Sequence, residues 1–314
     1  MPTTAILTFR NHRFAVVAVG VGCLLLALAA VGVALWLGSF NVPQECLDNP
    51  EIRGTLPCLG TDDALAINEE WAGKVMAAMA VLPFVSGLLL GVPLVGTEIE
   101  TGTATIAWSL SSSRRRWLLA RVGVLGVTLA VLLAVPAIAA NALEAERLPR
   151  FDLATAVILD FGLRGPLVVA RGLAMFSISL LIGLAMGRVL PGLIVAGVAG
   201  LVLYYIVSLA QGVGWPAPEP FDARPGAYFM EYPHEWVDHE GTAFSFQELV
   251  ARAPAPLGDP AFDTWLADNY REVAVGIAGE RLAIVEQREL GGLAVLTLAL
   301  VGTSAWLIER RRPY

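Results

Sequence analysis

Charge is scarce in this chain of 314 residues: only 16% of the residues are charged, whereas 56% are hydrophobic, and the mean hydropathy is +0.66. Soluble globular domains carry charge on roughly a quarter of their residues. A soluble fold of this composition would have too little polar surface to cover its apolar interior. The composition therefore excludes an ordinary soluble domain and predicts a protein with much of its surface against lipid.

Cysteine is also rare, at three residues. Cys23 lies in an apolar run, where a thiol is expected to pack without reacting. Cys46 and Cys58 lie close together in a polar segment, and a bond that closes this short loop would stabilise the fold by about 3 kcal/mol. Such a disulfide requires an oxidising compartment outside the cytoplasm. Two unpaired thiols are the alternative.

Catalytic and nucleotide-binding motifs are absent from the sequence. Its only Gly-Lys pair, Gly73-Lys74, is followed by Val75, so there is no Gly-x-x-x-x-Gly-Lys-Ser/Thr loop to cradle the phosphates of ATP. The apolar runs contain almost no ionisable groups. Arg121 and Arg171 lie near the ends of theirs and are expected to snorkel toward the membrane surface. A membrane hydrolase or a proton-coupled transporter is therefore not favoured.

Two histidines lie among carboxylates in the acidic part of the chain. His234 and His239 could ligate zinc or copper. Their spacing of five residues does not place both on one helical face, and there is no His-Glu-x-x-His motif. We therefore expect a solvated acidic loop here and no metal site.

Long apolar runs are what the sequence does contain. A bilayer core needs about 20 apolar residues per helix, and the first run is longer than a signal-peptide core of about 7–15 residues. Six helices are expected to span the membrane, over residues 14–40, 75–95, 117–143, 170–189, 192–213 and 290–308.

The segments between these runs alternate in charge. Arginines cluster before the first run, between the second and third, between the fourth and fifth, and after the sixth: Arg10, Arg13, Arg114, Arg115, Arg116, Arg121, Arg188, Arg310, Arg311 and Arg312. The segments 41–74 and 214–287 are acidic. Because positive loops stay in the cytoplasm, both termini are expected on the inner side of a bacterial cell membrane.

The expected fold class is all-α, a polytopic membrane protein with six transmembrane helices. Residues 1–213 would hold helices one to five, with an outer loop at 41–74 and an inner segment at 97–116. Residues 214–289 would form an acidic extracellular cap, irregular because of its prolines but with a helix-like stretch over 261–289. Residues 290–314 would form the sixth helix and a basic tail.

Small residues at four-residue spacing predict close helix packing in two of the runs. The first set is Gly87 and Gly91, and the second is Gly192, Ala196 and Gly200. The pattern is common in any apolar helix, so it indicates packing faces but not their partners.

The inner segment between the second and third runs has an unusual pattern. Glu98 and Glu100 precede Thr101, Gly102 and Thr103, a composition typical of helix ends. A short amphipathic stretch over 104–110 follows, and then three serines, three arginines and a tryptophan. This pattern predicts a short helix on the inner membrane surface that meets a partner. An ordinary interfacial helix anchored by tryptophan and arginine is the alternative.

This segment resembles the coupling helix in permease subunits of type-2 ATP-binding-cassette (ABC) transporters. The matching residues are Glu98, Glu100, Gly102, Thr103, Ser113, Arg114 and Trp117. The resemblance extends to an interfacial helix at 7–13, a tight inner turn at 183–191 and a last helix with a basic tail at 289–312. The size and acidity of 214–287 and the paired cysteines depart from the family pattern.

The resemblance implies a permease subunit of an actinobacterial-like exporter. Its partners would be a separate cytoplasmic ATPase subunit, which holds ATP and Mg²⁺, and a second permease copy or paralogue, and no nucleic acid is expected. Glu98, Glu100, Gly102, Thr103 and Arg114 would couple to the ATPase. The substrate would be a hydrophobic or amphipathic compound.

In the resembling family the second and fifth helices line the central cavity. This implies substrate contacts for Phe84, Tyr204 and Tyr205, although helix packing explains the same residues. An alternative function is a membrane-embedded sensor or assembly factor that binds a partner through its extracellular segment and needs no ATPase.

Overall fold

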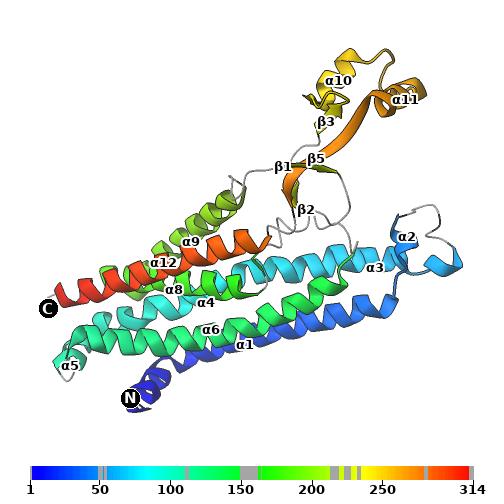
Figure 1. The fold of residues 1–314 in the computed structure, drawn as a ribbon. Coiled ribbons are helices and arrows are strands. Elements are labelled where there is room, and N and C mark those ends of the chain that lie inside the picture. The colour runs from blue at the N-terminus through cyan, green and yellow to red at the C-terminus, as the bar shows by residue number, and fades with distance from the viewer. Residues whose placement is uncertain are drawn as a thin grey trace. The chain divides into compact units, whose positions relative to one another are not determined.

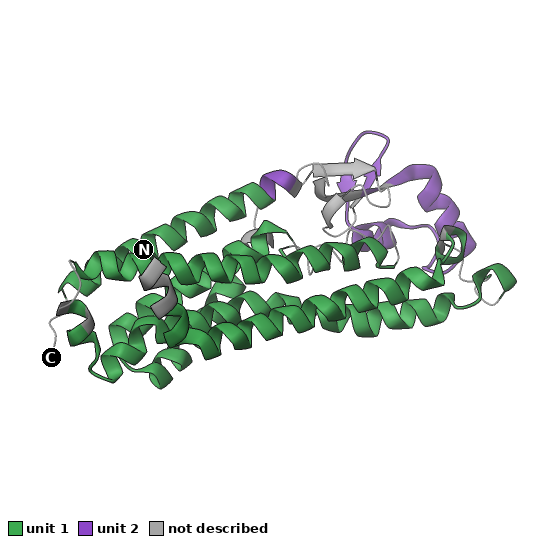
Figure 2. Ribbon diagram, turned by 90° about the horizontal axis from the view of Figure 1, so that it is seen from below, with its two compact units in different colours: residues 1–149, 162–209, 286–314 green, residues 150–161, 210–285 purple. Residues whose placement is uncertain are grey.

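The computed structural model describes residues 2–48, 52, 55–109, 113–148, 162–163, 165–212, 219–222, 228–231, 235–278 and 282–310. The chain divides into two compact units (Figure 2). The first comprises Met1–Pro149, Gly162–Leu209 and Glu286–Tyr314, and the second comprises Arg150–Phe161 and Ala210–Val285. Each unit is described by itself.

The first unit is a bundle of long helices (Figure 1). Its main members are α1 (Pro2–Phe40), α4 (Gly73–Glu100), α6 (Arg114–Glu146), α8 (Pro166–Met186), α9 (Val189–Gly212) and α12 (Leu282–Arg310). Shorter elements are α2 (Gln44–Asp48), η2 (Leu56–Cys58), α3 (Thr61–Ile67), η3 (Asn68–Ala72) and α5 (Ala104–Ser109).

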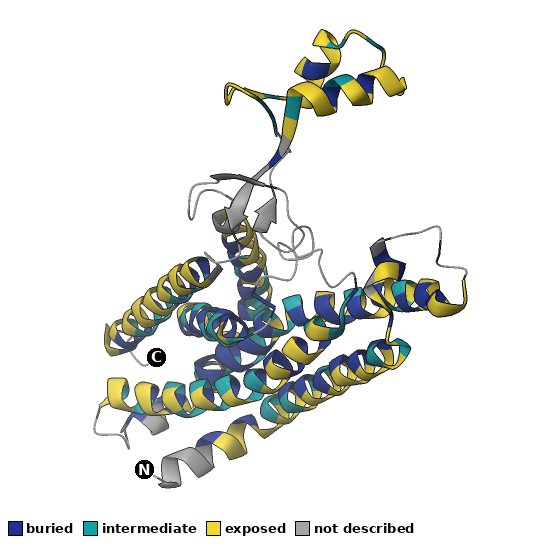
Figure 3. Cartoon of the chain, turned by 45° about the vertical axis from the view of Figure 1, so that its right-hand side comes forward, coloured by how far each residue is buried: buried dark blue, intermediate teal, exposed yellow. Residues whose placement is uncertain are grey.

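Six helices of the described residues are long and apolar enough to cross a membrane: Thr8–Phe40, Leu56–Glu100, Arg114–Glu146, Pro166–Met186, Val189–Leu209 and Ala283–Arg310. The six predicted spans are thereby confirmed. Several helices extend beyond the apolar runs because their polar flanks are helical as well. Exposed positions run along the outward faces of the long helices (Figure 3), where they include large apolar side chains such as Leu25 and Val131. Such faces suit a lipid environment.

The two glycines of the first predicted packing face let α4 approach α8 at backbone distance. A Cβ atom at Gly87 would lie 2.7 Å from the carbonyl oxygen of Gly172, and one at Gly91 would lie 2.5 Å from that of Phe176. On the α8 side, a Cβ atom at Gly183 would lie 2.5 Å from the carbonyl oxygen of Val92. Only glycine fits at these positions, so α4 and α8 form the tightest pair in the bundle.

The second predicted packing face, on α9, meets the same two helices. Ala196 is fully buried in an apolar cluster with Val92 and Met175. A Cβ atom at Gly200 would lie 3.1 Å from Cε of Met175. Both sets of small residues therefore lie at helix contacts, as predicted.

Both ends of the bundle carry elements that the sequence had suggested. The start of α1, the short helix α5 and the end of α12 lie at one end, whereas α2 and α3 lie at the other (Figure 1). A disulfide joins Cys46 and Cys58, whose Cα atoms are 5.5 Å apart, which confirms the predicted bond. Cys23 is a free, buried thiol.

The second unit contains a sheet. Its strands are β1 (Glu219–Asp222), β2 (Tyr228–Glu231), β3 (Glu235–Asp238), β4 (Ala243–Phe244) and β5 (Tyr270–Ala278). The long β5 pairs antiparallel with β1, β2 and β3, and β4 pairs with β3. Helices α10 (Phe246–Arg252) and α11 (Pro260–Asn269) add a small core around Leu249, Phe262 and Leu266.

This sheet corrects two expectations for the 214–289 segment. The predicted irregular cap contains regular strands, and the predicted helix-like stretch over 261–289 is α11, then β5, then the start of α12. Within Tyr270–Ala278, residues 273–278 alternate β-branched and small residues, a strand pattern that outweighs the helical signal on either side. His234 lies outside the described residues, and Nε2 of His239 lies 3.1 Å from the carbonyl oxygen of Asp268.

Candidate functional site

The inner segment between α4 and α6 begins with a sharp helix end. Helix α4 ends at Glu100, and Gly102 takes a left-handed conformation (φ +73°). A Cβ atom at Gly102 would meet nothing within 4 Å, so its backbone angle, and not a lack of space, favours glycine there. The hydroxyl of Thr101 donates to the carbonyl oxygen of Thr97 (2.7 Å) and lies 3.0 Å from that of Thr103. These contacts close α4 and turn the chain into α5.

Glu98 is held by α6. Its Oε1 accepts a hydrogen bond from Nη1 of Arg121, and the two side chains are only 13% and 10% exposed. The expectation that Arg121 snorkels toward water is therefore wrong: the guanidinium turns inward, pairs with Glu98 and lies 4.2 Å above the ring of Trp117. This ion pair fixes the end of α4 to the beginning of α6.

Glu100 is held by α9. Its Oε2 accepts a hydrogen bond from the backbone N–H of Val189 (2.9 Å), the first residue of α9. A carboxylate at this position satisfies an unpaired N–H group and interacts favourably with the positive end of the helix dipole. The two acidic residues thus connect α4 to two different helices.

Aromatic rings and arginines hold α5 against the bundle. Trp108 is 8% exposed and packs edge to face on Trp117, with ring centroids 6.5 Å apart. The guanidinium of Arg114 lies 4.9 Å over the Trp108 ring. Ser113 caps α6 by accepting a hydrogen bond from the N–H of Arg116 (3.2 Å). Ile106 points away and is 63% exposed, so α5 is anchored on one side and presents an apolar side chain on the other.

The predicted coupling residues are thus brought to one end of the bundle. Glu98, Glu100, Gly102, Thr103 and Arg114 all lie within or beside the α4–α5–α6 connection. Sequence reasoning did not identify Arg121 and Val189 as the partners of the two glutamates. The available signal for the Glu98–Arg121 pair was an acid at the end of one span and a base near the start of the next. The partner of Glu100 is a backbone N–H, which leaves no signal in a sequence.

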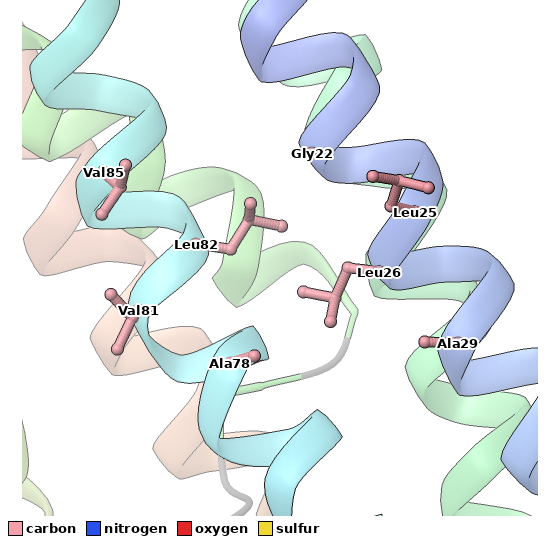
Figure 4. Close-up of a pocket in the computed structure, with 8 residues that line it drawn as sticks. All are labelled: Gly22, Leu25, Leu26, Ala29, Ala78, Val81, Leu82 and Val85. Carbon is pink, nitrogen blue, oxygen red and sulfur yellow. The ribbon is translucent and has the colours of Figure 1, made fainter.

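The three residues predicted to contact substrate also lie together. Phe84 of α4 and Tyr204 of α9 pack edge to face with ring centroids 5.9 Å apart, and Tyr205 lies 6.0 Å from Tyr204. Tyr205 is 65% exposed. A separate groove of about 480 Å³ between α1 and α4 contains none of the three (Figure 4). Its lining is entirely aliphatic, with Leu26 and Leu82 pointing toward one another.

A second ion pair joins α8 to α12, level with the middle of α4. Arg171, in the second turn of α8, binds Oε1 of Glu289 in α12 through Nε (2.8 Å) and Nη2 (2.7 Å). Its Nη1 donates to the carbonyl oxygen of Gly162 (3.2 Å). Both side chains are less than 8% exposed. The expectation that Arg171 snorkels is therefore also wrong, because a partner 118 residues away leaves no local signal in a sequence.

A family model for ABC-2 membrane transporter related proteins matches residues 16–211, which is more than half of the chain. The chain belongs to this family. The match covers α4, α5 and α6 in full, including the inner segment between α4 and α6, and it identifies the chain as a membrane transporter subunit of the ABC-2 permease type. No curated protein and no solved structure matches the chain. The second unit lies mostly beyond the matched residues, because only 150–161 and the first two residues of 210–285 fall within them.

Proposed function

We propose that this chain is the permease subunit of an ABC exporter that moves a hydrophobic or amphipathic compound across a bacterial cell membrane. A separate cytoplasmic ATPase subunit would bind ATP and Mg²⁺ and supply the energy, because the chain contains no phosphate-binding loop. The observation that carries the proposal is the α4–α5–α6 connection at the bundle end that carries the arginines. Its short helix α5 packs on α6, and the two glutamates at the end of α4 bind α6 and α9.

The mechanism follows from the contacts of the two glutamates. ATP closes the ATPase dimer, which displaces α5 through its exposed side. The Glu98–Arg121 pair passes this displacement to α6, and the hydrogen bond from Glu100 to Val189 passes it to α9. Movement of α9 relative to α4 then separates Tyr204 from Phe84 and opens the path for release on the outer side.

The assembly would contain two permease subunits, identical or paralogous, with both termini of each in the cytoplasm. The arginine clusters support this orientation, since they belong to the start of α1, the start of α6, the α8–α9 turn and the end of α12, and the start of α1 and the end of α12 lie at the bundle end that holds α5. The Cys46–Cys58 disulfide at the opposite end supports an oxidising compartment there.

The central experiment is copurification from native membranes. The chain is expected to bring down a Walker-type ATPase, and the complex is expected to hydrolyse ATP. Purification of an intact, membrane-inserted permease without any ATPase, under conditions that preserve complexes, contradicts the proposal. It would favour a sensor or assembly factor that binds its partner through the 214–289 segment.

A second experiment tests the coupling residues within that complex. Glu100→Lys places a positive charge at the positive end of the α9 dipole, so it should abolish transport while membrane insertion and ATPase binding persist. Glu98→Lys should have the same effect, and the exchange Glu98→Arg with Arg121→Glu should restore part of the transport because it re-forms the pair. Glu70→Lys, an exposed acid at the opposite end, is the matched control. Normal transport in both single variants would refute the assignment.

The aromatic cluster is tested in the same transport assay. Alanine at both Tyr204 and Tyr205 should lower the transport rate, because the two phenol rings would contact the substrate. Unchanged transport would mean that the two tyrosines only pack between helices and do not contact the substrate.

A further inference from the structure

A cavity of about 360 Å³ lies between the beginning of α1 and the end of α4, at the bundle end that carries α5. Helix α1 leaves helical geometry at its border, where His12 has φ −110° and ψ 15°. The lining combines polar side chains with a few apolar ones: Asn11, His12, Phe14, Ala15, Pro93, Thr97, Glu98, Thr101 and Thr103.

Two buried polar atoms of the lining have no hydrogen-bond partner among the described residues. One is Nε2 of His12, whose side chain is only 7% exposed, and the other is Oε2 of Glu98. Oε1 of the same carboxylate is already engaged by Arg121. Buried polar atoms in native proteins nearly always have a partner, because leaving one unpaired is costly. The two atoms therefore indicate a ligand that enters the cavity.

The threonines make this cavity rich in hydrogen-bond acceptors. The Thr97 hydroxyl donates to the carbonyl oxygen of Pro93 (2.7 Å), and the Thr101 hydroxyl donates to that of Thr97 (2.7 Å). Their hydrogens are thus in use, which leaves oxygen lone pairs to add to the free carboxylate oxygen of Glu98. A primary ammonium group has three N–H donors and no acceptor, so it matches this lining.

The charge of the surroundings favours an ammonium group that brings its own anion. Glu98 and Arg121 neutralise one another, and Arg121 also interacts electrostatically with His12. A bare cation would therefore add an uncompensated charge to a partly buried site. A zwitterionic phosphoethanolamine group instead carries a phosphate. The guanidinium of Arg13 lies 4.8 Å over the ring of Phe14, which lines the cavity and is 77% exposed. A guanidinium next to a lining residue is a suitable partner for that phosphate.

We propose that this cavity binds the headgroup of an ethanolamine phospholipid, with the ammonium group on Glu98 and His12 and the phosphate on Arg13. Phe14 and Ala15 would contact the start of the acyl chains, at the level where a lipid headgroup lies in a membrane. The bound lipid would join α1 to the end of α4 that leads into α5. This site goes beyond the proposed transport function and does not depend on it.

The test compares lipids that differ only at the nitrogen. The full chain, in detergent, is titrated with phosphatidylethanolamine and with phosphatidylcholine of the same acyl chains, and apparent affinity is read from the shift in unfolding temperature. Methylation removes all three N–H donors, so the wild type should prefer phosphatidylethanolamine at least tenfold. Soluble phosphoethanolamine, which lacks acyl chains, is titrated in parallel and should bind far more weakly.

Two variants and one matched control locate the site. Thr97→Val and His12→Leu each remove an acceptor and should reduce the preference to about twofold or less. Thr128→Val is the control, because the Thr128 hydroxyl donates to the carbonyl oxygen four residues earlier, just as Thr97 does, but lies in α6 outside the cavity. It should keep the full preference. Should His12→Leu fail to fold, the Thr97 and Thr128 pair decides.

Three results would overturn the proposal. The first is equal affinity of the wild type for both lipids, which would leave only water in the cavity. The second is an unchanged preference in Thr97→Val, or an equal loss in Thr128→Val, which would place the preference elsewhere. The third is binding of soluble phosphoethanolamine as tight as that of the lipid, which would make the ligand a soluble amine.

Discussion

Removing one partner of the buried Arg171–Glu289 pair should destabilise the bundle far more than removing both. Glu289→Gln keeps the size of the side chain but removes the carboxylate charge that Arg171 binds through Nε and Nη2, at a site less than 8% exposed. Breaking a buried pair from one side typically costs about 3–5 kcal/mol. The hydrogen bond from Arg171 to the carbonyl oxygen of Gly162 does not replace the lost charge.

The double replacement Arg171→Met with Glu289→Met removes both charges together. Apolar side chains of similar volume at a buried pair are often neutral or stabilising. The double variant should therefore be more stable than Glu289→Gln. The losses of stability in Arg171→Met alone and Glu289→Met alone should add up to about 3 kcal/mol or more above the loss in the double variant.

Thermal unfolding of the purified chain in nanodiscs measures these differences. At about 2–4 °C for each kcal/mol, Glu289→Gln should lower the unfolding temperature by roughly 6–20 °C. The control is Glu70→Gln in the pair with Lys74, which is about as short at 2.7 Å but whose side chains are 59% and 63% exposed. It should cost no more than about 1 kcal/mol. Equal shifts for Glu289→Gln and Glu70→Gln would refute the reasoning that burial decides the strength of the effect.

Two further predictions concern packing and pH. Gly91→Ala should lower the unfolding temperature and separate α4 from α8, because its Cβ atom would lie 2.5 Å from the carbonyl oxygen of Phe176. Gly123→Ala is the control and should be neutral or slightly stabilising, because a Cβ atom there meets nothing within 4 Å. Equal effects of the two variants on the unfolding temperature would contradict this packing. In the second unit, hydrogen bonds from the backbone N–H and hydroxyl of Ser245 hold the pKa of Glu248 below its usual value. The stabilisation of α10 by this carboxylate should therefore persist at neutral pH and decline as the pH falls through the lowered pKa. Hydrogen exchange of the α10 amides, corrected for intrinsic rates, should show this decline in the wild type but not in Glu248→Gln. The same decline in Glu248→Gln would contradict the role given to this carboxylate.

Hydropathy was sufficient to predict the membrane part of the fold. Lipid imposes one requirement on every span, a helix of sufficient length with an apolar surface, and a run such as 14–40 meets it without reference to any other part of the chain. The small residues at Gly87 and Gly91 likewise marked a contact correctly, because only close approach of another backbone uses the space that they leave. The identity of the partner helix had no such local signal.

The polar contacts could not be predicted for the same reason. Arg121 and Arg171 were expected to snorkel because nothing in the sequence pairs an arginine with an acid 23 or 118 residues away. The sheet around β5 was missed because nearby prolines in the same segment indicated irregular structure. Strand pairing depends on partners such as β1 and β3, which lie more than 30 residues upstream of β5.

The backbone contact between α4 and α8 has a mechanical consequence. Where Gly87 and Gly91 meet Gly172 and Phe176, the two backbones are in direct contact, so α4 and α8 are expected to move together as one rod. One end of this rod carries Glu98 and Glu100, and the N-terminal part of α8, toward its other end, carries Arg171. Under the proposed transport mechanism, a push received at the α5 end of this rod would therefore reach the contact of α8 with α12 at Glu289 without bending either helix.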